Sequence, residues 1–201
     1  PISSLDQTFE EAVATRLVKL SNQRQVIIFT HRLSMLGLIE ELSKKQNIDI
    51  NKLAVTKEYW GTGEPGDTPL FAKNPKEALN NLIDKLSEAK KTLEEEGTEK
   101  YKIKADSIIT NFRIIIERVI ESILLGGIVQ RYRKNVHTQK VKDLNKIKVE
   151  DCQLIDGLMT RYSSPLHSQS SETPTQLLEP NELEADFKKL KKWIDEFNKR
   201  N

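Results

Sequence analysis

This chain has little cysteine and no long apolar run, and its positive and negative charges almost cancel. Cys152 is the single cysteine among 201 residues, which excludes an internal disulfide framework and a cysteine-rich zinc site. No apolar stretch approaches the ~20 residues that a membrane-spanning helix needs, and no targeting segment is recognisable. Lys and Arg total 32 against 30 Asp and Glu, so any nucleic-acid-binding surface must be local. These absences predict a soluble, cytoplasmic protein.

The first 45 residues alternate between helical and strand-like patterns. A candidate N-cap at Asp6 precedes apolar residues at helical spacing, and the same spacing returns after residue 32. Between them, Val26–Phe29 is a run of four apolar residues rich in β-branching, which predicts a strand buried on both faces of a sheet. Helix, strand and helix in this order are typical of a layered α/β fold. The residues expected to face its core are Phe9, Val13, Leu17, Leu20, Leu33, Leu36, Ile39 and Leu42.

A turn-rich stretch, EYWGTGEPGDTP, divides the chain after a short predicted strand in LAVTKEYW. We expect an α/β lobe in residues 1–72 and a helical module in residues 73–201, which makes the fold class α+β and predominantly α-helical. The first helix of the module is capped by Asn74 and ends at Gly97. The remaining helices are predicted at 98–125, 128–136 and 149–161, followed by a last helix capped by Asn181 and Glu184.

PISSLD opens the chain, and VIIFTHR follows one predicted helix later. In this order they resemble the D-loop and the switch-histidine loop of ABC-type nucleotide-binding domains. The resemblance implies that the D-loop reaches across an ATP-bound homodimer and that His31 contacts the γ-phosphate. Phosphoryl transfer depends on positioning and electrostatic stabilisation, which an imidazole at the end of a strand can supply. The implied D-loop residues are Ser3, Ser4, Leu5 and Asp6.

Motifs of the other half of such a domain are missing. The chain has no G-x-x-x-x-G-K-[ST] loop to cradle phosphates, no LSGGQ-like signature and no Asp-Glu pair after a strand to hold magnesium. We therefore expect ATP with Mg to bind only when the missing half is present, and the isolated chain not to hydrolyse ATP. Two arrangements stay open. The chain is either the C-terminal part of a longer ATPase, which we favour, or a subunit that shares its site with another polypeptide.

The helical part contains FRIIIERVIESILLGGIVQRYRKNVHT and LMTRYSSPLHSQSSETP, which with the opening are spread over residues 1–174. They resemble SMC-like ABC ATPases of bacterial phage defence, the group that includes the anticodon nucleases RloC and PrrC. The resemblance implies an RNA-cleaving triad of Arg113, Glu117 and His167 that acts on tRNA. The sequence departs from the family where Ser164–Leu166 separates a Tyr-Ser pair from the histidine, because the nucleases tend to read Tyr-Ser-His.

Arg113, Glu117 and Glu121 share one stripe of their predicted helix, with apolar residues on both edges. An exposed pair at this spacing contributes only ~0.3–0.5 kcal/mol, whereas a partly desolvated pair more often has a purpose. Metal-independent RNA cleavage needs a base, an acid and a cation near the phosphate, and Glu117, His167 and Arg113 are able to fill these roles in some order. The alternative is a structural ion pair.

A basic strip runs from Ile128 to Lys148, with seven Lys or Arg residues and one acid, Asp143. Basic side chains suit phosphates and an interleaved aromatic suits an unpaired base, so the strip predicts RNA or DNA binding; the alternative is a solvated surface. The same strip serves a second function class, in which the helical module is a non-catalytic platform for DNA or a partner protein, moved by the ATPase. The residues expected to bind nucleic acid are Arg131, Tyr132, Arg133 and Lys134. No zinc, haem or flavin motif is present.

Overall fold

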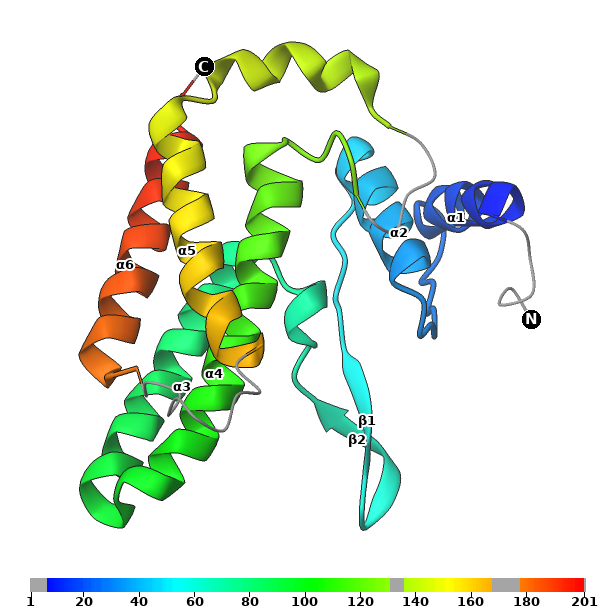
Figure 1. Cartoon of the computed structure of the whole chain (residues 1–201). Helices are drawn as coiled ribbons and strands as arrows, with labels where there is room; N and C mark the ends of the chain where they lie inside the picture. Colours follow the sequence, from blue (N-terminus) through cyan, green and yellow to red (C-terminus); the bar gives the residue numbers. More distant parts are fainter. Residues whose placement is uncertain (1–6, 131–135, 168–177, 201) are drawn as a thin grey trace. The chain divides into compact units, whose positions relative to one another are not determined.

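The computed structural model describes residues 7–130, 136–167 and 178–200 (Figure 1). The described chain is mainly helical, and its one sheet has two strands, which confirms the predicted α+β, predominantly α-helical class. It divides into two compact units between Thr68 and Pro69, four residues before the predicted boundary, and Gln130 and Val136 group with the first unit. No described helix combines the length and the apolar character that a bilayer crossing requires.

Two helices, α1 (Gln7–Ser21) and α2 (Leu33–Lys45), pack together in the first unit. Their small core is built from Ala14, Val18, Met35 and Ile39. The predicted core face of α1 is wrong at its start, because Phe9 is 62% exposed. The buried face of α1 instead follows positions 10, 14 and 18. Phe9 comes one residue before this face and is therefore rotated about 100° away from the core.

The predicted strand Val26–Phe29 is not a strand in the structure. Ile28 packs against the small core of α1 and α2, but Ile27 is 70% exposed and Phe29 is 88% exposed. A strand buried on both faces needs paired strands beside it and a layer on each side. No described segment pairs with these residues, so the apolar run stays outside any sheet, with Val26 and Ile28 partly covered and Ile27 and Phe29 in water.

The two strands of the sheet, β1 (Ala54–Glu58) and β2 (Gly61–Gly66), form an antiparallel hairpin with a register shift between Thr56 and Lys57. The predicted strand in LAVTKEYW is therefore confirmed as β1. Tyr59 and Trp60 make the turn, and their rings meet edge to face at 4.8 Å. Both rings are largely exposed.

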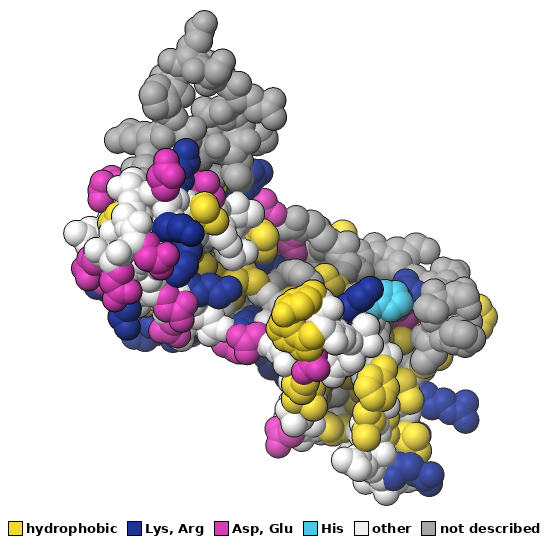
Figure 2. Space-filling view, turned by 90° about the horizontal axis from the view of Figure 1, so that it is seen from below, with side chains coloured by type: hydrophobic (Ala, Val, Ile, Leu, Met, Phe, Trp, Pro, Cys, Tyr) yellow, Lys and Arg dark blue, Asp and Glu magenta, His cyan; other side chains and the backbone are white. Residues whose placement is uncertain are grey.

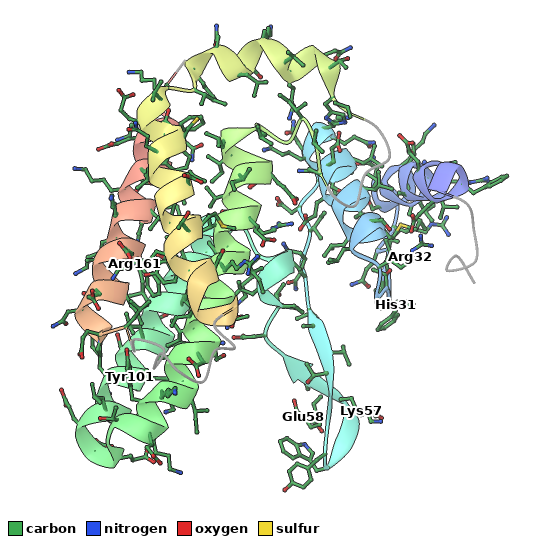
Figure 3. The ribbon with its side chains drawn as sticks, in the orientation of Figure 1. His31, Arg32, Lys57, Glu58, Tyr101 and Arg161 are labelled. Atoms are coloured by element: carbon green, nitrogen blue, oxygen red, sulfur yellow. The ribbon has the colours of Figure 1, made fainter. Side chains whose placement is uncertain are left out.

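The second unit is a bundle of four helices that alternate in direction: α3 (Pro75–Glu96), α4 (Thr98–Val119), α5 (Val149–His167) and α6 (Pro180–Phe197). α3 and α4 form a hairpin around Gly97, whose φ of 87° favours glycine. The start of α3 meets the end of α6 through Lys76 and Asp195 (2.5 Å). The start of α6 meets the end of α5 through Glu182 and Arg161 (2.8 Å), so α5 runs antiparallel to α6 and to α4 (Figure 3).

Aromatic side chains fill the centre of this bundle. The Phe112 ring of α4 lies 4.7 Å from the Tyr162 ring of α5 and 4.5 Å from the Phe187 ring of α6. All three side chains are fully buried, and each buried aromatic contributes roughly 1.5–3 kcal/mol through the hydrophobic effect. The Tyr162 hydroxyl donates to Asp186 Oδ2 at 2.8 Å, so its polar atom is satisfied inside the bundle. The second unit therefore has a complete core of its own.

Helix boundaries agree with the sequence where the caps are unambiguous. Asn74 caps α3 as predicted, because its Oδ1 accepts from the Lys76 N–H at 3.0 Å. The predicted cap of α6 is wrong: Glu179 is the N-cap and forms a capping box with Glu182, since Pro180 takes the first helical position. The helix expected at 128–136 is absent from residues 128–130 and 136, and residues 131–135 lie outside the described chain.

The described part of the second unit also contains three short helical segments. η2 (Leu70–Ala72) precedes α3, and the π-helical turn η3 (Ile120–Leu124) continues α4. The 3₁₀ segment η4 (Thr138–Lys146) leads into α5. π-helical turns are rare and often lie at functional sites, and this one directly follows the helix that carries the predicted charged stripe.

Candidate functional site

His31 lies exposed between the apolar run Val26–Phe29 and Arg32, the N-cap of α2. The neighbouring Arg32 Nε lies 3.2 Å from Glu10 Oε1, and the Ser34 hydroxyl donates to the same carboxylate at 3.2 Å. Glu10 belongs to α1 and its side chain is fully buried. α1 thus holds the backbone on the C-terminal side of His31, while the imidazole itself stays open to solvent (Figure 3).

Glu10 was not predicted from the sequence. Its signal is weak, because a glutamate among apolar positions on an amphipathic helix is ordinarily assigned to the solvent side. Only its partners, Arg32 and Ser34, explain why the carboxylate is buried. The predicted D-loop residues Ser3, Ser4, Leu5 and Asp6 lie outside the described residues.

The charged stripe of α4 contains the predicted pair. Arg113 Nε lies 3.5 Å from Glu117 Oε1, and each side chain is 28% exposed. The two side chains are therefore partly desolvated, but neither is enclosed. The structure brings Arg113 and Glu117 together, as their spacing predicts.

The third member of the predicted triad, His167, is the last residue of α5, and its side chain is not among those that the structure describes. The Phe112 and Tyr162 rings set the level at which α4 and α5 meet. His167 comes five residues after Tyr162, and because the helices are antiparallel Glu117 lies five residues away in the opposite direction. At ~1.5 Å per residue, the two backbones differ in level by about 15 Å along the bundle. The corresponding difference between His167 and Arg113 is about 9 Å.

The predicted nucleic-acid contacts Arg131, Tyr132, Arg133 and Lys134 also lie outside the described residues. The described part of the basic strip consists of residues 128–130 and 136–148 and includes η4. No side chain of η4 is buried. The segment is fixed by its ends, because the His137 N–H donates to the Ile128 carbonyl at 2.9 Å and Arg200 Nη1 donates to the Lys146 carbonyl at 3.5 Å.

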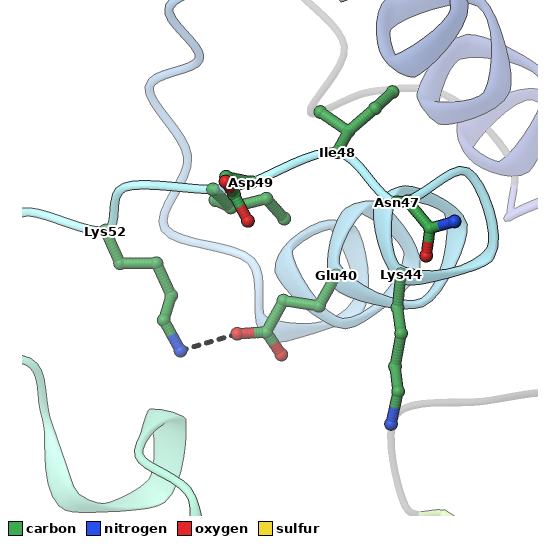
Figure 4. A pocket seen from close by; sticks show the side chains of 7 residues that line it. Glu40, Lys44, Asn47, Ile48, Asp49 and Lys52 are labelled. Atoms are coloured by element: carbon green, nitrogen blue, oxygen red, sulfur yellow. Dashed lines mark hydrogen bonds and ion pairs between the residues drawn. The ribbon is translucent and has the colours of Figure 1, made fainter.

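A shallow pocket lies at the C-terminal end of α2 (Figure 4). Lys52 Nζ donates to Glu40 Oε1 at 2.6 Å across it, and Lys44 and Asp49 also line it. The pocket contains none of the predicted site residues, and its charges are balanced. Within residues 7–130, 136–167 and 178–200, no group of three His, Cys, Asp or Glu side chains is arranged to hold a metal ion.

Comparisons of the chain with known protein families, with curated proteins and with solved structures give no match. The function therefore has to be argued from the chemistry of the residues themselves.

Proposed function

We propose that the first unit supplies the D-loop and the switch histidine of an ABC-type nucleotide-binding domain, in an SMC-like ATPase of the cytoplasm. The observation that carries this proposal is the alternating burial of the run Val26–Phe29, in which Ile28 packs on the helices while Ile27 and Phe29 are bare, two residues before an exposed His31. A run with this pattern is suited to enter a sheet whose other strands belong to the segment or subunit that carries the Walker sequences.

Exposed apolar side chains concentrate in the first unit. Contiguous exposed apolar surface is uncommon on a protein that works alone, and burying one large side chain stabilises a complex by roughly 1.5–3 kcal/mol. Figure 2 shows yellow apolar side chains gathered on one face. The large apolar residues exposed in this unit are Phe9, Ile27, Phe29, Leu33, Ile50, Leu53, Val55, Tyr59, Trp60 and Val136.

In the completed domain, His31 positions the γ-phosphate or the attacking water. ATP with Mg supplies the phosphoryl group that is transferred to water. An imidazole at the end of a sheet strand accepts or donates one hydrogen bond at a fixed point, which orients the γ-phosphate or the attacking water. The ion pair between Arg32 and the buried Glu10 limits how far this point can move.

The proposal is tested in the assembly that contains the Walker sequences. His31→Ala should lower ATP turnover by about 10²-fold or more without preventing assembly, since general acid–base and positioning groups typically supply ~10²–10⁴-fold. Lys57→Ala, at an exposed position of the hairpin, is the control and should keep the wild-type rate. Near-normal turnover by His31→Ala would remove the switch-histidine assignment.

Assembly itself is tested on the bare face. Ile27→Asp combined with Phe29→Asp should prevent association with the Walker-bearing part, measured by co-purification of the two tagged parts. Ile103→Asp is the matched control, because Ile103 is also 70% exposed but lies on α4 of the other unit. If the double variant assembles as well as the control, the run does not enter a shared sheet.

For the helical unit we propose a non-catalytic platform moved by the ATPase, and the helix levels favour it. General acid–base catalysis needs its groups within hydrogen-bond distance or joined by one bridging water. The ~15 Å offset along the bundle between the Glu117 and His167 backbones disfavours such a contact. The alternative hypothesis, an anticodon nuclease, predicts that the helical unit is catalytic. Glu117→Gln or His167→Ala would then reduce tRNA cleavage by ~10²–10⁴-fold while ATP turnover persists.

The measurement is tRNA integrity on gels after expression of the complete ATPase, with Glu121→Gln, one turn further along the stripe, as the comparison. Intact tRNA with the wild-type protein under activating conditions supports the platform. Cleavage that depends on both Glu117 and His167, in variants that melt at the wild-type temperature, would replace the platform by a ribonuclease.

A further inference from the structure

One end of the helical unit gathers basic side chains that are distant in the sequence. The segment from Thr138 to Lys148 contributes four lysines against one acid, Asp143. The residues after α6 join it, because Arg200 Nη1 donates to the Lys146 carbonyl. We call this surface the basic end; its cations are Lys140, Lys142, Lys146, Lys148, Lys199 and Arg200.

Contacts hold three cations of the basic end, Lys140, Lys146 and Arg200, and only Arg200 is neutralised by its contacts. Lys146 Nζ and the Arg200 guanidinium each lie 5.1 Å from the centre of the buried Phe197 ring, so one aromatic side chain holds two positive charges close together. Arg200 is balanced by Asp151. Lys140 donates to the Gly126 carbonyl at 3.0 Å, which fixes its position and leaves its charge.

The ammonium groups of Lys142, Lys146, Lys148 and Lys199 form no ion pair with any residue in the described ranges. Two exposed acids, Asp143 and Glu150, share this end, and Glu196 is paired with Lys192 at 3.8 Å. Asp195 interacts electrostatically with Lys199, but its ion pair is with Lys76 at 2.5 Å. The surplus is therefore a set of separate lysine charges at one end of the bundle. Separated point charges of this kind match a chain of phosphates.

The opposite end of the same bundle has a different character. The turn between α3 and α4 and the start of α6 carry carboxylates interleaved with lysines, and Figure 2 shows this end with magenta and dark blue side chains mixed. The bundle is thus polarised along its axis, and a polyanion approaches the basic end preferentially. The carboxylates of the opposite end are Glu94, Glu95, Glu96, Glu99, Glu179 and Glu182.

η4 has the properties of a contact element and few of a structural one. It runs for nine residues without a buried side chain, whereas 3₁₀ runs longer than three or four residues are uncommon. Its side chains add little to the core, yet both of its ends are tied to the bundle. We propose that the basic end, with η4 at its centre, binds the phosphate backbone of nucleic acid. This inference rests on the proposed platform role of the helical unit and names its partner.

The test uses the whole chain and fluorescence anisotropy with two labelled probes of about 20 nucleotides, a single-stranded RNA and a DNA duplex, between about 50 and 200 mM salt. The wild-type affinity should fall steeply with salt. The triple variant Lys142→Glu/Lys148→Glu/Lys199→Glu should bind at least about tenfold more weakly at low salt. For the RNA probe, the slope of log K against log salt should shrink by about 2, from ~0.7 for each lost phosphate contact.

The matched control reverses the same number of charges at the other end of the bundle. Lys91→Glu/Lys100→Glu/Lys102→Glu also changes three exposed lysines and should leave the salt slope unchanged. Equal loss in the two triple variants, or no binding by the wild type at low salt, would overturn the proposal. Preferential binding of the basic end to phosphatidylserine-containing vesicles, lost in the first triple variant while RNA and DNA do not bind, would assign it to membranes instead.

The three lysines of the first variant are exposed, and circular dichroism melts verify that it folds. The outcome is also separable from the proposed ATPase function. If the His31 effect on ATP turnover is observed and the salt slopes of the two triple variants agree, only the nucleic-acid inference fails.

Discussion

Replacing Asp151 by alanine should destabilise the helical unit by about 2–4 kcal/mol. The Asp151 side chain, 2% exposed, accepts from three donors on two helices and their ends: the Lys148 N–H at 2.8 Å, Trp193 Nε1 at 2.7 Å and Arg200 Nη1 at 2.5 Å. Without the carboxylate, the buried indole N–H loses its acceptor at a cost of about 1–3 kcal/mol. The first turn of α5 loses its cap at a further ~0.5–2 kcal/mol.

Trp193 is also the reporter for this measurement. The chain has two tryptophans, so in a Trp60→Phe background the fluorescence follows the helical unit during urea unfolding. Asp156→Ala is the matched control, because Asp156 is an exposed aspartate of the same helix, and its free energy of unfolding should stay within ~0.5 kcal/mol of the wild type. A loss below ~1 kcal/mol for Asp151→Ala, or an equal loss for Asp156→Ala, would refute the reasoning.

The same carboxylate predicts a pH dependence. Burial alone would raise the pKa of Asp151, but hydrogen bonds from Arg200, the Lys148 N–H and Trp193 outweigh burial and hold the pKa below its ordinary value of 3.8. A pKa depressed in the folded state means that this stabilisation is fully present above pH 3.8 and is lost as the pH falls through the folded pKa. Asp151→Asn should therefore flatten the acid limb of the unfolding free energy below about pH 4. An unchanged acid limb would contradict the assignment.

Three further changes are predicted. Burial raises the pKa of Tyr101 to about 12 from 10.0, so its contribution to stability is present below pH 10 and is lost as the pH rises towards 12; Tyr101→Phe should flatten this alkaline limb in urea titrations. Phe112→Ala should cost about 3–5 kcal/mol in the same assay, against less than ~0.5 kcal/mol for the exposed Ile103→Ala. Gly97→Ala should lower the melting temperature, because a φ of 87° strains any other residue by ~1–3 kcal/mol, whereas Gly157→Ala inside α5 should raise it.

The helical unit was predictable because its signals are local. Asn74 marks the start of α3, because it offers a capping oxygen and is followed by Pro75 and Glu77 in the first turn. Gly97 marks the end of the helix. The start of α6 was misplaced because Glu179 and Asn181 both offer a capping oxygen, and only the position of Pro180 decides between them. Local chemistry thus fixes the helices and leaves an error of about two residues at an ambiguous cap.

The run Val26–Phe29 shows that a local sequence pattern does not determine whether a segment is buried in a sheet. Four consecutive apolar residues predict burial on both faces, but whether the burial occurs depends on other segments, and none in the described residues provides it. For the candidate sites, the Arg113–Glu117 pair follows directly from helical spacing. The buried Glu10 beside Arg32 could not be predicted in this way, because its partners lie 22 and 24 residues away across a fold whose packing had to be known first.

The small core of the first unit has a consequence for the lifetime of the protein. Few buried side chains join α1 to α2, so local opening costs little free energy there, while the α3–α6 bundle opens only with its whole aromatic centre. Amide hydrogens of the bundle should therefore exchange slowest. Under the proposed assembly with the Walker-bearing part, an unassembled copy would present an easily opened segment around residues 22–32 to proteases, and association would protect it. Under the same proposal, degradation would act as a check on stoichiometry, because copies in excess of their partner would be removed.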